Sequence, residues 1–274
     1  MSRWLFFIVL VACSARVAAH DTWLAPEPPT GSRSYWTVQL TTGNAFPALE
    51  TAAEPERVER AELVTSSRRL PLIAMTANAH ALPFRVVSDE DTVSVAVVAM
   101  RPYDIELTPE LVETYVRDEL GSDEQILARY RSQGRWRERF TKNAKALIRS
   151  GGAAPAAIAI QPHGLAYELV PTVDPTVVVA GESFQVCAYA NGVPVRREQA
   201  RVHVGLVEAD SSSALHAADR NGCVRVRPRT TEGYLLHSIL ITPVDAGDID
   251  WKSQFASLTV RRAAAPSFPM RSQP

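Results

Sequence analysis

Hydrophobic and polar residues alternate between Thr22 and Met100, which is the pattern of β-strands with one buried face. Alternating or β-branched runs occupy residues 34–42, 57–65, 68–75, 82–87 and 92–100. These runs are separated by Pro, Gly, Asn and Asp, which favour turns. Short alternating runs broken by turn residues predict an antiparallel β-sandwich in this part of the chain.

The pattern changes after residue 107. Thr108, Pro109 and Glu110 form a helix start, because a capping threonine precedes a proline and an acid in the first turn, and residues 110–120 continue the helix. A second helix is predicted over residues 135–149. Apolar residues recur there every four positions, at Trp136, Phe140, Ala144 and Ile148.

Strand patterns return after a Gly-, Ala- and Pro-rich segment, residues 151–163, that we interpret as a linker. Turn signals, among them Asn191-Gly192 and Asn221-Gly222, then recur about every ten residues, which is typical of a small immunoglobulin-like sandwich. The sequence therefore predicts a mainly β protein of two β-sandwich (immunoglobulin-like) units with a helical segment between them. The expected units are an N-terminal domain over 20–150, the linker over 151–163, a C-terminal sandwich over 164–262 and a loose tail over 263–274.

The amino terminus has the features of a secretory signal. Arg3 precedes an apolar run, and small residues occupy 17–19, so we expect residues 1–19 to be cleaved and the mature chain to begin at His20 in the periplasm or outside the cell. An alternative stays open, because Leu10-Val11-Ala12-Cys13 also fits a lipoprotein signal, which would anchor the protein through a lipid on Cys13. The mature chain contains no apolar run long enough for a transmembrane helix.

Charge and motifs exclude several classes of function. Removing residues 1–19 removes Arg3 and Arg16 and no acid, which leaves 27 basic and 30 acidic residues and no bulk attraction to nucleic acid. The chain has no nucleophile elbow, phosphate-binding glycine loop, His-Glu-x-x-His helix or Cys-x-x-Cys pair. We therefore expect a binding protein and not an enzyme.

Two cysteines remain in the mature chain if residues 1–19 are removed, Cys187 and Cys223. Each lies in an alternating run on the more polar face, and an exported protein encounters an oxidising environment. We expect a disulfide between neighbouring strands on an outer sheet face, with two free thiols as the alternative.

His20 is the most unusual of the six histidines. As the first residue of the mature chain it would offer a metal ion both an amine and an imidazole nitrogen, donors that suit copper, nickel, cobalt or zinc. The alternative is an unliganded first residue. On its predicted strand, His203 lies on the face opposite to Val202 and Val204, so we expect its ring to face solvent. His237 shares a strand face with apolar residues, which predicts a buried core histidine.

Five segments of the chain, in this order, resemble a family of bacterial periplasmic proteins often described as periplasmic components of cobalt or nickel uptake systems. The segments are AHDTWLAP at 19–26, TTGNAFP at 41–47, RERFTKNAKALIRSG at 137–151, GLAYELVPTVDP at 164–175 and DWKSQFASLTV at 250–260. The resemblance implies a signal peptide, a mature amino-terminal histidine, β-rich domains and a membrane permease as the partner.

The chain departs from this family at two places. By the resemblance, a histidine and a methionine of relatives become Leu240 and Ile241, and Gly43-Asn44 stands where relatives often have Gly-His or Gly-Glu. Only His20 carries over directly, although His237 and His163 could supply further ligands. The expected function is a periplasmic binding component for one nickel, cobalt or copper ion. Its rivals are a structural or interaction module without metal and a copper enzyme that uses His20.

Overall fold

The computed structural model describes residues 21–29, 35–86, 93–150, 154–196, 202–209, 214–230 and 233–261. The expected signal peptide, Cys13, His20 and the tail therefore lie outside the described residues. The described residues form three sheets, two α-helices, α1 (Pro109–Leu120) and α2 (Glu124–Gln133), and two 3₁₀ helices, η1 (Pro55–Arg57) and η2 (Ala157–Ile160).

The three sheets are open and differ in size. The first sheet has the order β1-β2-β7-β6 with β3 beside β2, and the third has the order β11-β12-β13 with β16 beside β12. Between them the central sheet runs β15-β14-β17-β18-β10-β8-β4-β5, with β9 beside β10. The strand bounds of the first sheet are β1 (Asp21–Glu27), β2 (Trp36–Gly43), β3 (Thr51–Ala52), β6 (Ile73–Ala74) and β7 (Leu82–Val86). Those of the central sheet are β4 (Val58–Val64), β5 (Arg69–Pro71), β8 (Val93–Met100), β9 (Tyr103–Leu107), β10 (Trp136–Arg149), β14 (His203–Glu208), β15 (Ala214–Ala217), β17 (Tyr234–Pro243) and β18 (Trp251–Arg261). Those of the third sheet are β11 (Tyr167–Pro171), β12 (Phe184–Ala190), β13 (Val193–Pro194) and β16 (Cys223–Val226).

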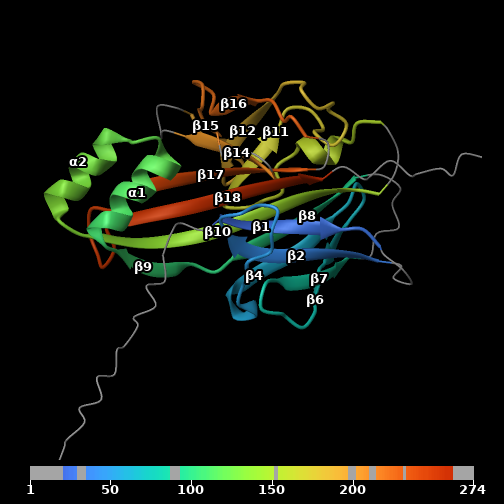
Figure 1. Ribbon diagram of the computed structural model, residues 1–274, viewed down its shortest axis with the longest axis horizontal. Coiled ribbons are helices and arrows are strands. Elements are labelled where there is room, and N and C mark those ends of the chain that lie inside the picture. The colour runs from blue at the N-terminus through green and yellow to red at the C-terminus, as the bar shows by residue number, and fades with distance from the viewer. Residues whose placement is uncertain are drawn as a thin grey trace, which may run out of the picture.

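The central sheet is shared by two sandwiches. On β8, Val95 and Val97 join a core with the third sheet, whereas Ala96 and Val98 join a core with the first sheet. Both faces of β8 are buried, which explains why residues 93–100 are almost continuously apolar. Figure 1 shows β11, β12 and β16 above the long central strands, and β2, β6 and β7 below them. The prediction of a mainly β fold with sandwich packing is confirmed.

The helix predicted over residues 135–149 is wrong, because these residues form the long strand β10. A spacing of four residues returns to the same face of a strand as well as near the same face of a helix, so the recurrence of Trp136 and Phe140 did not separate the two structures. β10 pairs in parallel with β18 and antiparallel with β8. The central sheet therefore joins strands from both sides of the segment 151–163 that was interpreted as a linker.

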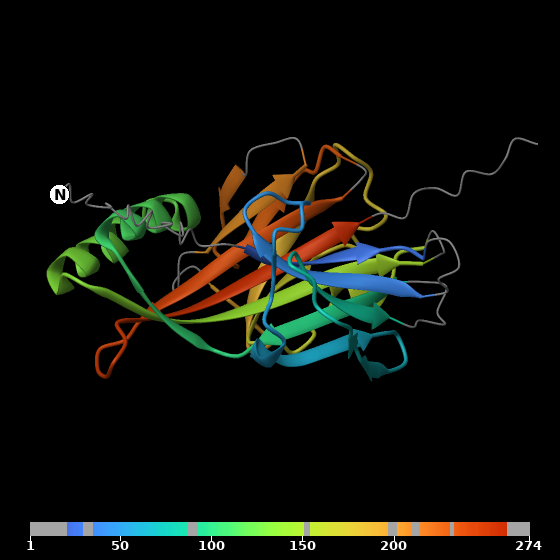
Figure 2. The same ribbon diagram turned by 60° about the horizontal axis from the view of Figure 1, so that its bottom comes forward.

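The helical segment is a hairpin of α1 and α2 at one end of the central strands β10, β17 and β18 (Figure 2). The helix predicted over 110–120 is confirmed as α1, which ends at Gly121 in the left-handed conformation (φ 63°). α2 was not predicted, although Asp123 caps it by accepting hydrogen bonds from the backbone N–H groups of Gln125 and Ile126. Beneath the hairpin, the Trp136 and Trp251 rings stack with centroids 4.6 Å apart.

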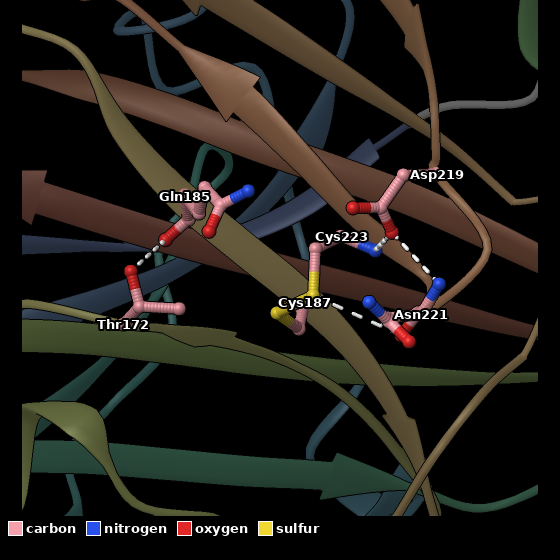
Figure 3. Close-up of a disulfide and its surroundings, with 6 residues drawn as sticks. All are labelled: Thr172, Gln185, Cys187, Asp219, Asn221 and Cys223. Atoms are coloured by element: carbon pink, nitrogen blue, oxygen red, sulfur yellow. Dashed lines mark hydrogen bonds between the residues drawn. A yellow bond between two sulfur atoms is a disulfide. The ribbon is translucent and has the colours of Figure 1, made fainter.

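The predicted disulfide between Cys187 and Cys223 is confirmed. The two cysteines are register partners on the antiparallel strands β12 and β16, on the face of the third sheet that points away from the core. Asp219 supports the turn before β16, since its carboxylate accepts hydrogen bonds from the backbone N–H groups of Asn221 and Cys223 (Figure 3). The bond therefore ties two strands of one sheet at its outer surface.

Neither helix among the described residues is long and apolar enough to cross a membrane.

Candidate metal site

Four ionisable side chains gather where β1, the end of α1, β10 and β17 meet. His237 Nδ1 lies 3.3 Å from Asp21 Oδ1 and 3.6 Å from Glu119 Oε2. The ammonium of Lys142 on β10 interacts electrostatically with the negative charges of Asp21 and Glu119. We call Asp21, Glu119, Lys142 and His237 the His237 cluster. It brings the first described residue of the chain beside a strand close to the other end.

The cluster lies at a seam in the packing of the central sheet. Leu235 and Ile239 share the face of β17 that carries His237; Leu235 packs with Trp23 of β1, and Ile239 packs beneath the helix hairpin. β1 is fixed to the sheet at this point, because Ser257 Oγ on β18 donates a 2.6 Å hydrogen bond to the Thr22 carbonyl. Asp21 and Glu119 therefore approach His237 from two separately anchored elements.

Two glycines make room for histidine rings beside the seam. Gly205 on β14 is the register partner of His237, and a Cβ at Gly205 would lie 1.8 Å from His237 Nε2. A Cβ at Gly121 would lie 2.8 Å from His203 Nε2. The prediction that His203 faces solvent is therefore wrong, because the end of α1 covers the outer face of β14. The only sequence signal for this packing was that His203 is followed two residues later by Gly205, which places both residues on the same face of a strand.

Charges within the cluster change the acidity of its members. Burial alone would lower the pKa of His237, but the negative charge and hydrogen bond of Asp21, together with Glu119, raise it to about 9. Burial, reinforced by the charge of Asp21, raises the pKa of Glu119 to about 7. Burial lowers the pKa of Lys142 to about 8. At neutral pH His237 is thus protonated, and a metal ion would have to displace that proton.

The cluster offers one imidazole nitrogen and the oxygens of two carboxylates, donors that suit nickel, cobalt, copper or zinc. Within the described part of the chain, no group of three His, Cys, Asp or Glu side chains is arranged to hold a metal ion. His20, which the sequence marks as the leading candidate ligand, lies outside the described residues and is bonded to Asp21. The described side chains alone therefore do not make a metal site.

His163 does not join the His237 cluster. Its Nε2 lies 3.1 Å from the Ile158 carbonyl oxygen, and its backbone N–H donates to Glu168. Glu168 in turn pairs with Lys145 at 2.8 Å on the face of β10 that looks toward the third sheet. Burial lowers the pKa of His163 to about 4. His163 and His237 therefore occupy opposite faces of the central sheet.

The chain departs from the family it resembles at Gly43-Asn44 and at Leu240-Ile241, and only the first of these places lies beside the cluster. Leu240 packs against the core with the third sheet, and Ile241 packs beneath the helix hairpin. Gly43, by contrast, is the register partner of Asp21 in the β1–β2 pair. Glu50 fills the space beside Gly43 and accepts hydrogen bonds from the backbone N–H groups of Asn44 and Ala45. The described residues 21–26 of the first resembling segment therefore lie beside the start of the second segment, TTGNAFP, next to the cluster.

A second buried acid, Glu138, lies under α1 and was not recognised from the sequence. Its carboxylate accepts hydrogen bonds from the Tyr115 hydroxyl at 3.2 Å, from Trp136 Nε1 at 2.7 Å and from the Ser253 hydroxyl. Burial raises the pKa of Glu138. Because the three donors come from α1, β10 and β18, Glu138 fastens the helix hairpin to the central sheet.

Comparison with known proteins places most of the chain in a family whose description assigns no function. The family described as "Domain of unknown function (DUF4198)" matches residues 17–241. No curated protein matches the chain. Among solved structures, the crystal structure of dimeric latent PorU from Porphyromonas gingivalis matches with a TM-score of 0.22 and 7% identity, over 88% of this chain and 20% of that one. The chain thus spans about a fifth of the length of that structure.

Proposed function

The chain belongs to the DUF4198 family, and from the geometry beside its amino-terminal strand we propose that it is an exported, non-enzymatic protein that binds one nickel or cobalt ion. The ligands in this proposal are the amine and imidazole of His20, the imidazole of His237 and a carboxylate of Asp21 or Glu119. Copper would bind the same donors. The protein would work in the periplasm and deliver the ion to a membrane permease.

One observation carries the proposal. Asp21 directly follows His20 in the chain, and its Oδ1 lies 3.3 Å from Nδ1 of His237. The sequence names His20 as the leading candidate ligand and His237 as a residue that could supply a further ligand. Nitrogen donors with a carboxylate form a ligand set for borderline transition metals and a poor one for calcium or magnesium. Displacing the His237 proton by a cation also preserves charge balance beside Asp21 and Glu119.

A second candidate has its own support. His237 already has two carboxylates within 3.6 Å, so the cluster also serves as a charge-paired tie between β1, α1 and β17. In that case the protein is a structural or interaction module that needs no metal. The two candidates differ in whether His20 and its free amine matter.

Calorimetric titration with Ni(II) separates the two candidates. The form that begins at His20 should bind one Ni(II) per chain, and His20→Ala or one extra residue before His20 should weaken binding by about 100-fold, since the extension turns the amine into an amide. His237→Gln should weaken binding by about tenfold, whereas the control His216→Gln on β15 should leave it unchanged. Equal binding by the mature, extended and His20→Ala forms would reject the proposal. No binding by any form would favour the structural module.

A further inference from the structure

A cavity of about 310 Å³ lies at the opposite end of β1 from the His237 cluster. It opens between the end of β1, the loop that follows β2, the start of β17 and the end of β18. Its size is at the lower end of the range for small-molecule sites, about 300–1,000 Å³. All residues that line it belong to the described part of the chain, and the proposed metal site uses none of them.

The walls of the cavity are apolar. Phe46 packs edge-on against the buried Trp23 with ring centroids 5.9 Å apart, which fixes the loop over the cavity. Gly233, at φ +141°, brings its backbone close to β18, where an added Cβ would lie 3.0 Å from the Val260 carbonyl oxygen. The apolar side chains around the cavity are Ala25, Pro26, Phe46, Pro47, Leu49, Ala209 and Val260.

Two opposite charges stand at the cavity. Arg261 Nη1 donates a 2.6 Å hydrogen bond to the Pro26 carbonyl, which holds the guanidinium at the edge and uses one of its five N–H groups. Glu27 accepts a 2.8 Å hydrogen bond from the side-chain amide of Gln39. Both residues line the same cavity, but the polar contacts described for them are to Gln39 and to Pro26 and not to each other. The two charges are thus separated and available to a ligand that carries both signs.

A buried polar atom adds to this arrangement. Thr259 lines the cavity with 3% of its surface exposed, and its hydroxyl has no hydrogen-bond partner among the described residues. An unsatisfied buried hydroxyl destabilises the fold, and a ligand acceptor within reach would remove part of that cost. Apolar walls with few convergent polar groups are the usual composition of a small-molecule site.

We propose that this cavity binds a free apolar amino acid. The side chain would lie among Ala25, Phe46 and Leu49, the carboxylate would bind the remaining N–H groups of Arg261, and the ammonium would bind Glu27. An apolar amino acid fits because it carries both charges next to an apolar body. A fatty acid would leave Glu27 facing an uncharged chain, and an amine without a carboxylate would leave Arg261 unused.

Calorimetric titration with L-leucine tests the proposal, with L-phenylalanine as a larger probe and a chelator present to keep metal out of the measurement. Leucine should bind at one site with a Kd of about 10 µM to 1 mM, as expected for a ligand clamped by two surface charges. Leucinamide, which lacks the carboxylate, and N-acetylleucine, which lacks the ammonium, should each bind at least about tenfold more weakly.

Substitutions assign each charge to its partner. Arg261→Gln should weaken leucine about tenfold and leave leucinamide unchanged, and Glu27→Gln should weaken leucine and leave N-acetylleucine unchanged. Arg131→Gln on the exposed face of α2 is the matched control and should bind leucine as the native chain does. Circular dichroism would verify that each variant is folded. No saturable binding of leucine or phenylalanine at 10 mM would overturn the proposal, and so would leucine binding that neither charge substitution changes.

Discussion

His163 and His237 illustrate how strongly the surroundings of a residue decide its behaviour. Both are buried, yet the pKa of His163 is lowered to about 4 by burial, and that of His237 is raised to about 9 because Asp21 and Glu119 outweigh its burial. The sequence identified both as candidate ligands and could not rank them. Their ranking depends on carboxylates from β1 and α1, which only the folded chain brings beside His237.

The lowered pKa of His163 predicts an acid-sensitive fold. Its folded pKa of about 4 lies below the usual value near 6.5, so the unfolded chain takes up the proton first as pH falls. The stability that neutral His163 contributes is complete above pH 6.5 and is lost toward pH 4, by about 3 kcal/mol. Urea denaturation of the native chain and of His163→Gln from pH 7 to pH 4 measures this loss. Parallel pH curves for the two proteins would contradict it.

The disulfide predicts a stability difference of its own. Closing the 36-residue separation between Cys187 and Cys223 restricts the unfolded chain, which should stabilise the fold by about 3–4 kcal/mol. The double variant Cys187→Ala, Cys223→Ala should therefore unfold at lower denaturant concentration, and a reductant should shift only the native protein. If the native chain unfolds at the same midpoint with and without reductant, the bond does not form.

Among the elements, β10 shows where the sequence was insufficient. Most strands and α1 could be predicted, because one face of each is apolar and turn residues or a capping motif mark its ends. β10 carries Glu138 and Lys145 at buried positions, where Tyr115 and Trp136 satisfy the first and Glu168 pairs with the second. Because these charged residues occupy buried positions, the sequence of β10 does not show the alternation of apolar and polar residues that is typical of a strand. α2 was missed because only Leu127 of its ten residues is buried.

The buried pair between β10 and β11 predicts unequal effects of its two substitutions. Glu168 accepts hydrogen bonds from Lys145 and from the backbone N–H groups of His163, Gly164 and Leu165. Lys145→Met leaves the carboxylate with three donors and should cost about 2–3 kcal/mol, whereas Glu168→Leu leaves a buried ammonium and three N–H groups unpaired and should cost about 4–5 kcal/mol. Chemical denaturation measures both. Equal losses, or a larger loss for Lys145→Met, would show that the backbone donors do not matter.

At the scale of the whole molecule, the two sandwich cores lie on opposite faces of one shared central sheet. The parallel pairing of β10 with β18 joins residues over a hundred positions apart, and no local pattern reveals such a partner. Sandwich packing could be predicted from alternation within each strand. The shared sheet could not be predicted, because its order depends on which strands pair.

A shared sheet predicts one cooperative unfolding transition. Separating the first sheet from the third would expose a face of β8 or β10, so neither sandwich should persist alone. Thermal unfolding followed by tryptophan fluorescence and by far-ultraviolet circular dichroism should give coincident curves. Two separated transitions would indicate that the sandwiches fold independently on either side of residues 151–163.

The proposed metal site requires that His20 and His237 bind the same metal ion. Electron paramagnetic resonance of the Cu(II)-loaded mature protein reports the nitrogens coordinated to the ion directly. We predict that His237→Gln removes one coordinated nitrogen from the spectrum and that His20→Ala changes the spectrum further, while His216→Gln leaves it unchanged. A spectrum that is the same for the native protein and for His237→Gln would contradict the proposed site.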